Sequence, residues 1–302
     1  MKCENRITDK RAKPVKPGNM NTLVIPSPAK INLFLKVVGR RPDGYHDIIT
    51  LLSRIGLFDT VVLNFDQPTI SVNCSHPRVP EDRSNLAYQA ASLFFEALSS
   101  HDGVAIFIEK VIPVAAGLGG GSSNAAAVLM GLNQYYGFPF KEGELLEMAV
   151  KVGADVPFFL FRHVAIARGI GNRLEVYEGL PPLSVLLVCP RFEVPTAWVY
   201  KNLNLTLTNQ EKKYKIIRFD QDFPNIKSTF FNDLEHVTIG KFPEIKTIKE
   251  TLLNLGAEIA LMSGSGPSVF GLFKDAQQAT KATHSITHRG IWKTFLVELL
   301  LP

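Results

Sequence analysis

The first part of the chain, from residue 23 to 75, has the alternation of apolar and polar residues that predicts β-strands. Over 29–37 every second residue is apolar, and Lys30, Asn32 and Lys36 lie between the apolar positions. Because successive side chains of a strand point to opposite faces, we expect one apolar face and one mixed face. The turn sequence Arg-Pro-Asp-Gly at 41–44 ends this strand, and a second extended stretch is expected over 48–62.

Helical spacing of apolar residues alternates with further strands along the rest of the chain. We expect helices over 84–98, 122–136, 141–152, 243–255 and 275–288, and strands over 104–110, 163–168, 173–178, 184–189, 267–273 and 293–300. This mixture predicts an α/β or α+β architecture. The sequence Gly-Leu-Pro-Pro at 179–182 is the best candidate for a domain boundary. It divides the chain into a basic tail over 1–20, a first domain over 21–180 and a second domain over 181–302.

Composition and charge narrow the classes of function. The chain has 302 residues, of which 46% are hydrophobic and 20% charged, as in ordinary globular proteins. No apolar run approaches the roughly 18 residues that indicate a membrane-spanning helix, so no membrane partner is expected. Six basic and two acidic residues lie within 1–20, so only +1 of the net charge of +5 belongs to the residues after Met20. This nearly neutral body argues against a nucleic-acid partner, and the basic tail is expected to be disordered.

The cysteines indicate the compartment. Cys3, Cys74 and Cys189 are odd in number and far apart in the sequence. They make neither a disulfide framework nor a zinc-binding pattern. We therefore expect a reducing, cytoplasmic location, and nothing in the sequence indicates an obligate protein partner.

The strongest local signal is a glycine-rich loop between the strand that ends near 110 and the helix expected from 122. Its glycines allow a close approach of the backbone to a ligand. Ser122 or Ser123 is expected to cap the helix, whose free N–H groups favour an anion, and Ala125–Ala127 are expected to keep its first turn slim for a polyphosphate. The alternative is a flexible linker or a packing turn. The residues expected to bind phosphates are Pro113, Val114, Ala115, Ala116, Gly117, Leu118, Gly119, Gly120, Gly121, Ser122 and Ser123.

This loop differs from two familiar phosphate-binding sequences. A Walker A loop would have lysine where Gly121 stands. A dinucleotide-binding fingerprint would end in Gly or Ala where Ser122 stands. It would also need an acidic residue after a second strand about 20 residues later, whereas 138–142 opens a helix. A cation that assists phosphate binding must therefore come from a distant part of the chain.

Three sequence motifs resemble those of the GHMP kinases, the superfamily of galactokinase and of homoserine and mevalonate kinases. The pattern Pro-x-x-x-Gly-Leu-Gly-x-x-Ser-Ser-x-Ala over 113–125 resembles the second motif, 28–33 the first, and the glycine-rich 262–270 the third. The resemblance implies transfer of the terminal phosphate of ATP to a hydroxyl group. It also implies an α+β fold, with a ribosomal-S5-domain-2-like N-terminal domain, a ferredoxin-like C-terminal domain and the site between them.

The segments 27–35, 41–46, 117–126 and 153–159 resemble one branch of these kinases in particular. This implies phosphorylation of the 2-hydroxyl of a CDP-linked methylerythritol, in non-mevalonate isoprenoid biosynthesis, with Lys30 and Asp155 as the catalytic residues. From the residues alone, Asp155 is as easily the N-cap of a short helix, and a strand lysine is usually a solvated charge. The glycine loop lacks a lysine of its own, however, and a carboxylate that enters an apolar stretch needs a partner.

The same resemblance assigns the acceptor side of the site. It implies that Asn32, Tyr45 and His46 contact the cytidine and its sugar. It also implies that Tyr200 stacks on the cytosine. Trp198 is the alternative for this stacking, and core packing is an alternative for either aromatic residue.

The resemblance also assigns the nucleotide side of the site. Asn85 and Lys110 match positions near the adenosine of ATP, and Gly264 and Ser265 lie in a loop expected to close over the phosphates. The alternative for that loop is an ordinary turn between strands. No paired carboxylates indicate a metal site, so no protein ligand is assigned to a metal. Mg²⁺ is expected to be held mainly by the phosphates of ATP.

Two other functions remain open at this point. Another GHMP kinase, such as a mevalonate or homoserine kinase, would share the glycine loops but would not be expected to need the Gly-Tyr-His sequence at 44–46. An RNA-binding module is the second alternative, because the S5-like domain also occurs in translation proteins. The nearly neutral charge after Met20 argues against it.

Overall fold

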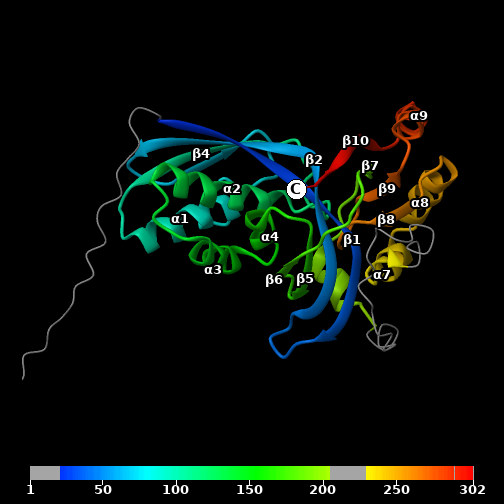
Figure 1. Cartoon of the computed structure of the whole chain (residues 1–302), viewed down its shortest axis with the longest axis horizontal. Coiled ribbons are helices and arrows are strands. Elements are labelled where there is room, and N and C mark those ends of the chain that lie inside the picture. Colours follow the sequence, from blue (N-terminus) through cyan, green and yellow to red (C-terminus); the bar gives the residue numbers. More distant parts are fainter. Residues whose placement is uncertain (1–20, 205–228, 289, 302) are drawn as a thin grey trace, which may run out of the picture.

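The fold is described by a computed structural model that covers residues 21–204, 229–288 and 290–301. The predicted tail over 1–20 lies outside the described residues. The N-terminal part consists of β1 (Thr22–Arg40), β2 (His46–Gln67), β3 (Ser71–Cys74), α1 (Leu86–Leu98), β4 (Gly103–Glu109), α2 (Gly120–Tyr135), α3 (Glu142–Val152), α4 (Val156–Phe161), β5 (Ala165–Gly169) and β6 (Arg173–Val176). In Figure 1 these helices lie together on one side of the strands.

The long antiparallel pair β1 and β2 organises the whole molecule. Its turn at 41–44 includes Gly44 at a φ of +89°, as the Pro-Asp-Gly sequence predicts. The pair contacts β4 and β5 through β2, and β10 also joins β2. Because both strands exceed the usual length, they cross from one half of the protein to the other (Figure 1). Residues far apart on β1 can therefore serve different parts of one site.

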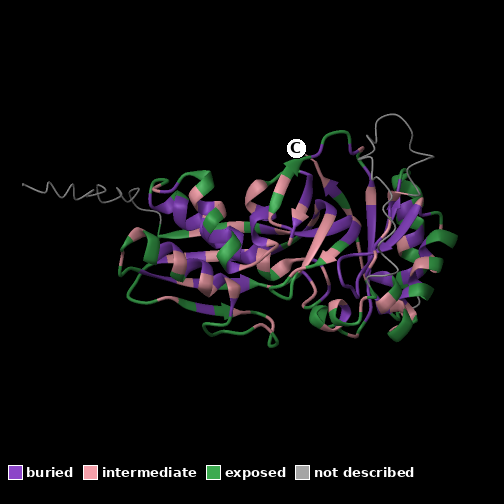
Figure 2. Ribbon diagram, turned by 90° about the horizontal axis from the view of Figure 1, so that it is seen from below, coloured by how far each residue is buried: buried purple, intermediate pink, exposed green. Residues whose placement is uncertain are grey.

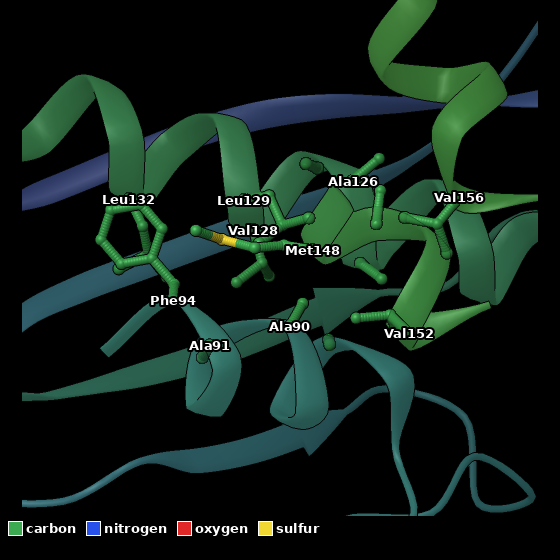
Figure 3. Close-up of a cluster of buried hydrophobic side chains, with 14 of the residues drawn as sticks. Ala90, Ala91, Phe94, Ala126, Val128, Leu129, Leu132, Met148, Val152 and Val156 are labelled. Atoms are coloured by element: carbon green, nitrogen blue, oxygen red, sulfur yellow. The ribbon is translucent and has the colours of Figure 1, made fainter. Parts of the chain in front are cut away.

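Helix α2 lies at the centre of the N-terminal helical layer. Residues 125–129 of this helix are fully buried, and Figure 3 shows Ala126, Val128 and Leu129 facing side chains of α1, α3 and α4. Small side chains allow neighbouring helices to approach closely. Ala125–Ala127 thus pack against protein, and the prediction that they make room for a polyphosphate is wrong.

The C-terminal part has the ferredoxin-like strand order. Its elements are β7 (Ser184–Cys189), α5 (Thr196–Lys201), α7 (Glu235–Lys241), α8 (Glu244–Asn254), β8 (Ile259–Met262), β9 (Val269–Phe273), α9 (Ala276–Thr287) and β10 (Lys293–Leu300). In this part β10 pairs with β7, β7 pairs with β9, and β9 pairs with β8. All three pairs are antiparallel. Helices α8 and α9 contribute buried side chains to the same core as these strands. The predicted α+β fold class is confirmed.

The two halves share a sheet. The end of β10 pairs with β2 at Leu299 and Leu300, which joins the ferredoxin-like strands to the N-terminal ones in a sheet of ten strands. Buried residues follow these strands through the middle of the molecule, and exposed ones lie on the outer helices and on the loops (Figure 2). The division into domains at residue 180 stays a prediction. In the part of the chain that the structure describes, no helix is long and apolar enough to cross a membrane.

Several short elements were not predicted from the sequence. They are β8, α5 and α7, each of four to seven residues. Such segments are too short for either a period of two or a period of 3.6 to be recognised, and the apolar run of β8 carries no period at all. Strand β3 lies within 23–75, where strands were expected, and α4 is the short helix that was considered as an alternative at Asp155. The long elements were predicted to within a few residues, except that β2 continues to Gln67.

The start of α2 corrects one prediction about the glycine loop. The helix begins at Gly120, its N-cap is Gly119 at a φ of +70°, and no side chain caps it. Ser122 and Ser123 therefore lie inside the first turn and are not caps. The hydroxyl of Ser123 is buried and receives a hydrogen bond from Ser27 at 2.7 Å. The N–H groups of the first turn are thus left for another acceptor.

Two glycines of this turn predict opposite effects on stability. A Cβ at Gly119 would lie 3.0 Å from both Lys30 Cγ and Phe159 Cζ, at a φ that disfavours L side chains. A Cβ at Gly121 would lie 3.7 Å from Leu86 Cδ1, an ordinary contact inside a helix. Gly119→Ala should therefore destabilise the fold by about 1–2 kcal/mol or more. Gly121→Ala should leave the fold unchanged or stabilise it by up to about 1 kcal/mol.

Thermal unfolding of the two variants beside the parent protein checks this pair. A lower melting temperature is expected for Gly119→Ala alone. If the two variants had the same melting temperature, the left-handed conformation at Gly119 would not be a constraint on the fold.

Candidate active site

A large cavity of about 1420 Å³ lies where the two halves meet. Its wall includes β1, the glycine loop with the start of α2, the turn before α4, helix α5 and the loop between β8 and β9. All predicted site residues line it except Ser123, whose side chain points to Ser27. The three segments that resemble kinase motifs, distant in sequence, thus meet at one site.

Hydrogen bonds from both halves of the protein fix the backbone of the glycine loop. Lys30 N–H donates to Leu118 O at 2.9 Å, which ties the loop to β1. On the C-terminal side, Ser263 Oγ donates to Gly117 O at 2.9 Å, and Ser268 N–H donates to Ala116 O at 3.3 Å. A Cβ at Gly117 would lie only 2.2 Å from Ser263 O, so glycine is required for the two loops to touch. The loop is therefore a built structure and not a flexible linker.

The head of α2 offers an anion-binding site. The first helical hydrogen bond is from Ser123 N–H to Gly119 O. Within the described parts of the chain, the N–H groups of Gly120, Gly121 and Ser122 have no acceptor, and these three residues line the cavity. Free N–H groups and the positive end of the helix dipole favour a phosphate here.

Lys30 and Asp155 form an ion pair within the cavity. Lys30 Nζ lies 3.7 Å from Asp155 Oδ2; the lysine side chain is 6% exposed and the carboxylate 41% exposed. The mixed face of β1 is therefore buried against the site and is not a solvated edge. A carboxylate in so apolar a sequence was predicted to need a partner. For Asp155 this partner is Lys30, which lies near the other end of the N-terminal half in the sequence.

Asp155 occupies the N-cap position of α4 but does not act as a cap. Its side chain accepts no hydrogen bond from the helix, and Pro157 is in the first turn. The helix thus places the carboxylate at the cavity wall without using its oxygens. This geometry leaves the carboxylate able to accept a proton or a hydrogen bond from a ligand.

A short hydrogen-bond chain sets the orientation of Lys30. The ammonium donates to Asn32 Oδ1 at 2.6 Å. Asn32 Nδ2 donates to Thr50 Oγ1 at 2.9 Å, and this hydroxyl donates to Phe34 O at 2.6 Å. Because the Thr50 hydroxyl donates its hydrogen to Phe34 O, it can only accept from Asn32, so Asn32 Nδ2 must face it. The amide oxygen of Asn32 is then left to accept from Lys30. Asn32 therefore holds the lysine in the site, in addition to its predicted contact with the acceptor.

The predicted cytidine-binding residues meet at another part of the wall. The His46 and Tyr200 rings lie 5.0 Å apart with an interplanar angle of 30°, and Tyr45 is exposed beside them. Burial lowers the pKa of His46, with a contribution from Arg40, so the neutral imidazole is favoured. Burial, followed by the charge of Asp155, raises the pKa of Tyr200, which keeps its hydroxyl protonated.

Trp198 does not line this cavity. It packs edge-on against Phe242 at 6.3 Å, and Lys241 Nζ lies 4.2 Å from the centre of its ring. Residues 198 and 200 lie on different sides of the short helix α5 because two positions of a helix differ by about 200°. Of the two aromatic residues considered for stacking, only Tyr200 faces the site.

The two residues predicted on the adenosine side are both engaged by the protein. Asn85 caps α1 by accepting from Ala87 N–H at 2.9 Å, and it donates to Pro80 O at 2.7 Å. Lys110 Nζ lies 2.9 Å from Asp59 Oδ2. Burial lowers the pKa of Lys110, although the charge of Asp59 acts in the opposite direction. Both residues line the cavity, so they shape this part of its wall.

Asp59 is a residue of the site region that the sequence did not indicate. Its carboxylate is fully buried and accepts the N–H groups of Val111 and Ile112, each at 2.8 Å. It thereby fixes the chain just before the glycine loop. Its position in the apolar-alternating strand β2 carried no separate signal. Thr50 also lies in β2 and was missed for the same reason. Ser263 belongs to the loop that was expected to close over the phosphates, but its contact with Gly117, 146 residues away, was not predicted.

The described residues contain no cluster of three or more His, Cys, Asp or Glu side chains that could hold a metal ion. Oxygen-bearing side chains that line the cavity include the hydroxyl of Ser122 and the carboxylate of Asp155. This small set of oxygen donors fits an ion such as Mg²⁺ that keeps most of its ligands from phosphates and water.

Comparison with known proteins identifies the family. Residues 85–163 match the model of the GHMP kinases N terminal domain, and residues 218–291 match that of the GHMP kinases C terminal domain. A homoserine kinase structure from Cytophaga hutchinsonii is similar with a TM-score of 0.74 but only 17% identity, covering 94% of this chain and 96% of that one. That likeness supports the fold.

Three similar proteins share a more specific name. A 4-diphosphocytidyl-2-C-methyl-D-erythritol kinase of Syntrophotalea carbinolica is 47% identical over 90% of this chain and 97% of its own length. One of Geobacter metallireducens is 44% identical over 93% of this chain and its whole length. A crystal structure of 4-(cytidine 5'-diphospho)-2C-methyl-D-erythritol kinase has a TM-score of 0.74 at 35% identity, with 92% of this chain and 99% of that chain covered. With this identity over nearly its whole length, the chain belongs to the 4-diphosphocytidyl-2-C-methyl-D-erythritol kinase family of the GHMP kinases.

Proposed function

We propose that this protein transfers the terminal phosphate of ATP to the 2-hydroxyl of 4-diphosphocytidyl-2-C-methyl-D-erythritol, a step of non-mevalonate isoprenoid biosynthesis. One observation carries the proposal. The Lys30–Asp155 pair, the uncapped head of α2 and the His46–Tyr200 pair line one cavity. Family membership supports both the reaction and the acceptor, because the similar proteins carry the name of that acceptor.

Asp155 is the residue that handles the proton of the attacking hydroxyl. Its carboxylate lies on the cavity wall and is not used as a helix cap. It can accept a hydrogen bond from the acceptor hydroxyl and take its proton as the new oxygen–phosphorus bond forms. Lys30, held by Asn32 at 2.6 Å, keeps a positive charge beside this carboxylate and toward the transferred phosphate.

The head of α2 and the glycine loop bind the phosphates of ATP. Peptide N–H groups of Gly120, Gly121 and Ser122 point from a helix N-terminus, where negative charge is stabilised. Mg²⁺ would be held mainly by the phosphates, with Ser122 and Asp155 as the oxygen donors nearby, and would neutralise phosphate charge. The backbone supplies fixed donors, so little reorganisation is needed during transfer.

The cytidine of the acceptor binds where Tyr45, His46 and Tyr200 meet. An exposed Tyr45 on the β1–β2 turn and a partly buried Tyr200 on α5 offer aromatic faces to a base. The neutral His46 has one donor and one acceptor nitrogen for hydrogen bonds. Binding energy from this remote group positions the reacting hydroxyl. A cytoplasmic location, expected from the cysteine content, remains part of this proposal.

Asp155→Asn tests the assignment of the proton acceptor. The variant should bind ATP and fold as the parent does, but turnover should fall by about 10²–10⁴-fold, because an amide cannot take the proton. Steady-state kinetics with CDP-methylerythritol, beside calorimetric binding of ATP, gives both quantities. The matched control is Asp275→Asn at the N-cap of α9, whose side chain does cap by accepting from Gln277 N–H at 2.8 Å. The control should keep both its turnover and, to within a few tenths of a kcal/mol, its stability, because an asparagine oxygen still accepts from Gln277 N–H. An Asp155→Asn variant with near-normal turnover would remove Asp155 from the mechanism.

Tyr200→Ala and Trp198→Ala together test recognition of the cytidine. Base–aromatic stacking is worth about 1–3 kcal/mol, so Tyr200→Ala should lower kcat/KM for CDP-methylerythritol by roughly 5- to 150-fold. Trp198→Ala should leave this ratio nearly unchanged, because its ring packs on Phe242 outside the cavity. The KM for ATP should stay constant in both. A larger effect at Trp198 than at Tyr200 would show that the cytosine binds elsewhere.

A further inference from the structure

Asn232 lies directly behind the glycine-rich loop between β8 and β9. Its side chain is 6% exposed and all its hydrogen-bonding groups are used. Asn232 Nδ2 donates to Met262 O at 2.9 Å and to Gly264 O at 2.7 Å, and Asn232 Oδ1 accepts from Leu234 N–H at 2.9 Å. One amide group therefore donates hydrogen bonds to two carbonyls of the loop, and Asn232 itself does not line the cavity.

The segment that carries Asn232 is fastened to β1. Leu35 N–H donates to Phe231 O at 2.8 Å, and Asp233 N–H donates to Leu35 O at 3.0 Å. Asp233 Oδ2 accepts from Val37 N–H at 2.8 Å. Because β1 also carries Lys30 and Asn32, the position of Asn232 is set by the same strand that positions the catalytic lysine.

The two bonds from Asn232 determine which way the loop peptides face. The C=O and N–H of one trans peptide point in opposite directions. Met262 O faces Asn232, and the N–H of the same peptide, that of Ser263, donates to Ser268 O at 2.9 Å on the other side. By the same geometry, Gly264 O faces Asn232 and the N–H of Ser265 points away from Asn232. Gly264 and Ser265 line the cavity, whereas Asn232 does not.

The N–H of Ser265 is available to a ligand. Among the residues that the structure describes it has no acceptor, and Gly264 and Ser265 both line the cavity. A Cβ at Gly264 would lie 3.6 Å from Lys30 Nζ, so this peptide lies beside the catalytic lysine. The hydroxyl of Ser265 is 2.7 Å from Thr196 Oγ1, which fixes the residue from the side of α5.

We propose that Asn232 is a positioning residue that turns the Ser265 N–H toward the terminal phosphate of bound ATP. The inference rests on the proposed kinase function and adds a residue outside the cavity wall to it. Because Gly264 lies near Lys30, the phosphate contacted is the one that is transferred and is absent from ADP. Loss of the Asn232 amide should therefore weaken ATP binding much more than ADP binding.

Asn232→Asp tests this directly. The side chain keeps its size and its bond from Leu234 N–H, but a carboxylate oxygen would face Gly264 O and repel it. The Kd for a non-hydrolysable ATP analogue should rise by roughly 10- to 100-fold, as expected for loss of a hydrogen bond to a charged group. The Kd for ADP should change by less than about threefold. Asn232→Ala serves as a second variant if the aspartate prevents folding, and the melting temperature reports on folding.

Asp233→Asn is the matched control, since an amide oxygen can still accept from Val37 N–H. Within the described part of the chain, the side chain of Asp233 makes no hydrogen bond to the loop between β8 and β9. It should keep the parent's ratio of ATP to ADP affinity. Equal weakening of both nucleotides in the Asn232 variants, or no weakening in folded protein, would overturn the proposal. Nucleotide binding can be measured by calorimetry without the substrate that accepts the phosphate. This result is therefore independent of the proposed function, which fails only if the parent protein does not phosphorylate CDP-methylerythritol.

Discussion

The contact between the two glycine-rich loops is the constraint on which the site depends. Gly117 and Ser263, 146 residues apart, approach so closely that a single methyl group at Gly117 would collide with the carbonyl of Ser263. This contact brings the head of α2, from the N-terminal half, to the loop that follows β8 in the ferredoxin-like half. The cavity exists because both loops are tied to β1, one through Lys30 N–H and the other through the segment that contains Asn232.

Strand β1 therefore has three functions at once. Its apolar residues form part of the core, its backbone holds the glycine loop, and the polar side chains of Lys30 and Asn32 line the cavity. The buried charge of Lys30 is acceptable because Asn32 and Asp155 compensate it, and a buried ammonium without such partners would be costly. A change in the register of β1 would turn Lys30 and Asn32 to the opposite face, so the catalytic geometry and the pairing with β2 are specified together.

The site combines rigid backbone donors with a few side chains of unequal exposure. Peptide N–H groups of α2 are fixed by the helix, whereas Asp155 is partly exposed at the cavity wall. This arrangement suits phosphoryl transfer, where positioning and charge stabilisation matter more than covalent chemistry. The acceptor side, with Tyr45 exposed on a turn and Tyr200 on a short helix, is built from parts outside the central sheet. Substrate choice in such a fold can thus change without disturbing the phosphate site.

The sequence by itself determined the long elements, the fold class through its motifs, and most of the residues that the structure brings together at one cavity. The glycine loop could be predicted because it is a local pattern. Lys30 and Asp155 were assigned through the resemblance to GHMP kinases, since their residue types alone are as consistent with a solvated charge and a helix cap. The tertiary structure decided what is paired with what. It made Gly119 the N-cap in place of a serine, buried Ser123 against Ser27, and used Ala125–Ala127 for packing. It also separated Tyr200 from Trp198, and revealed Asp59 and Asn232 as supports of the loops. In these contacts the hydrogen-bond partners of Ser123, Asp59 and Asn232 lie 30 to 96 residues away in the sequence. No periodicity within a short window can report such contacts, since they arise only when β1, β2 and the C-terminal strands form one sheet.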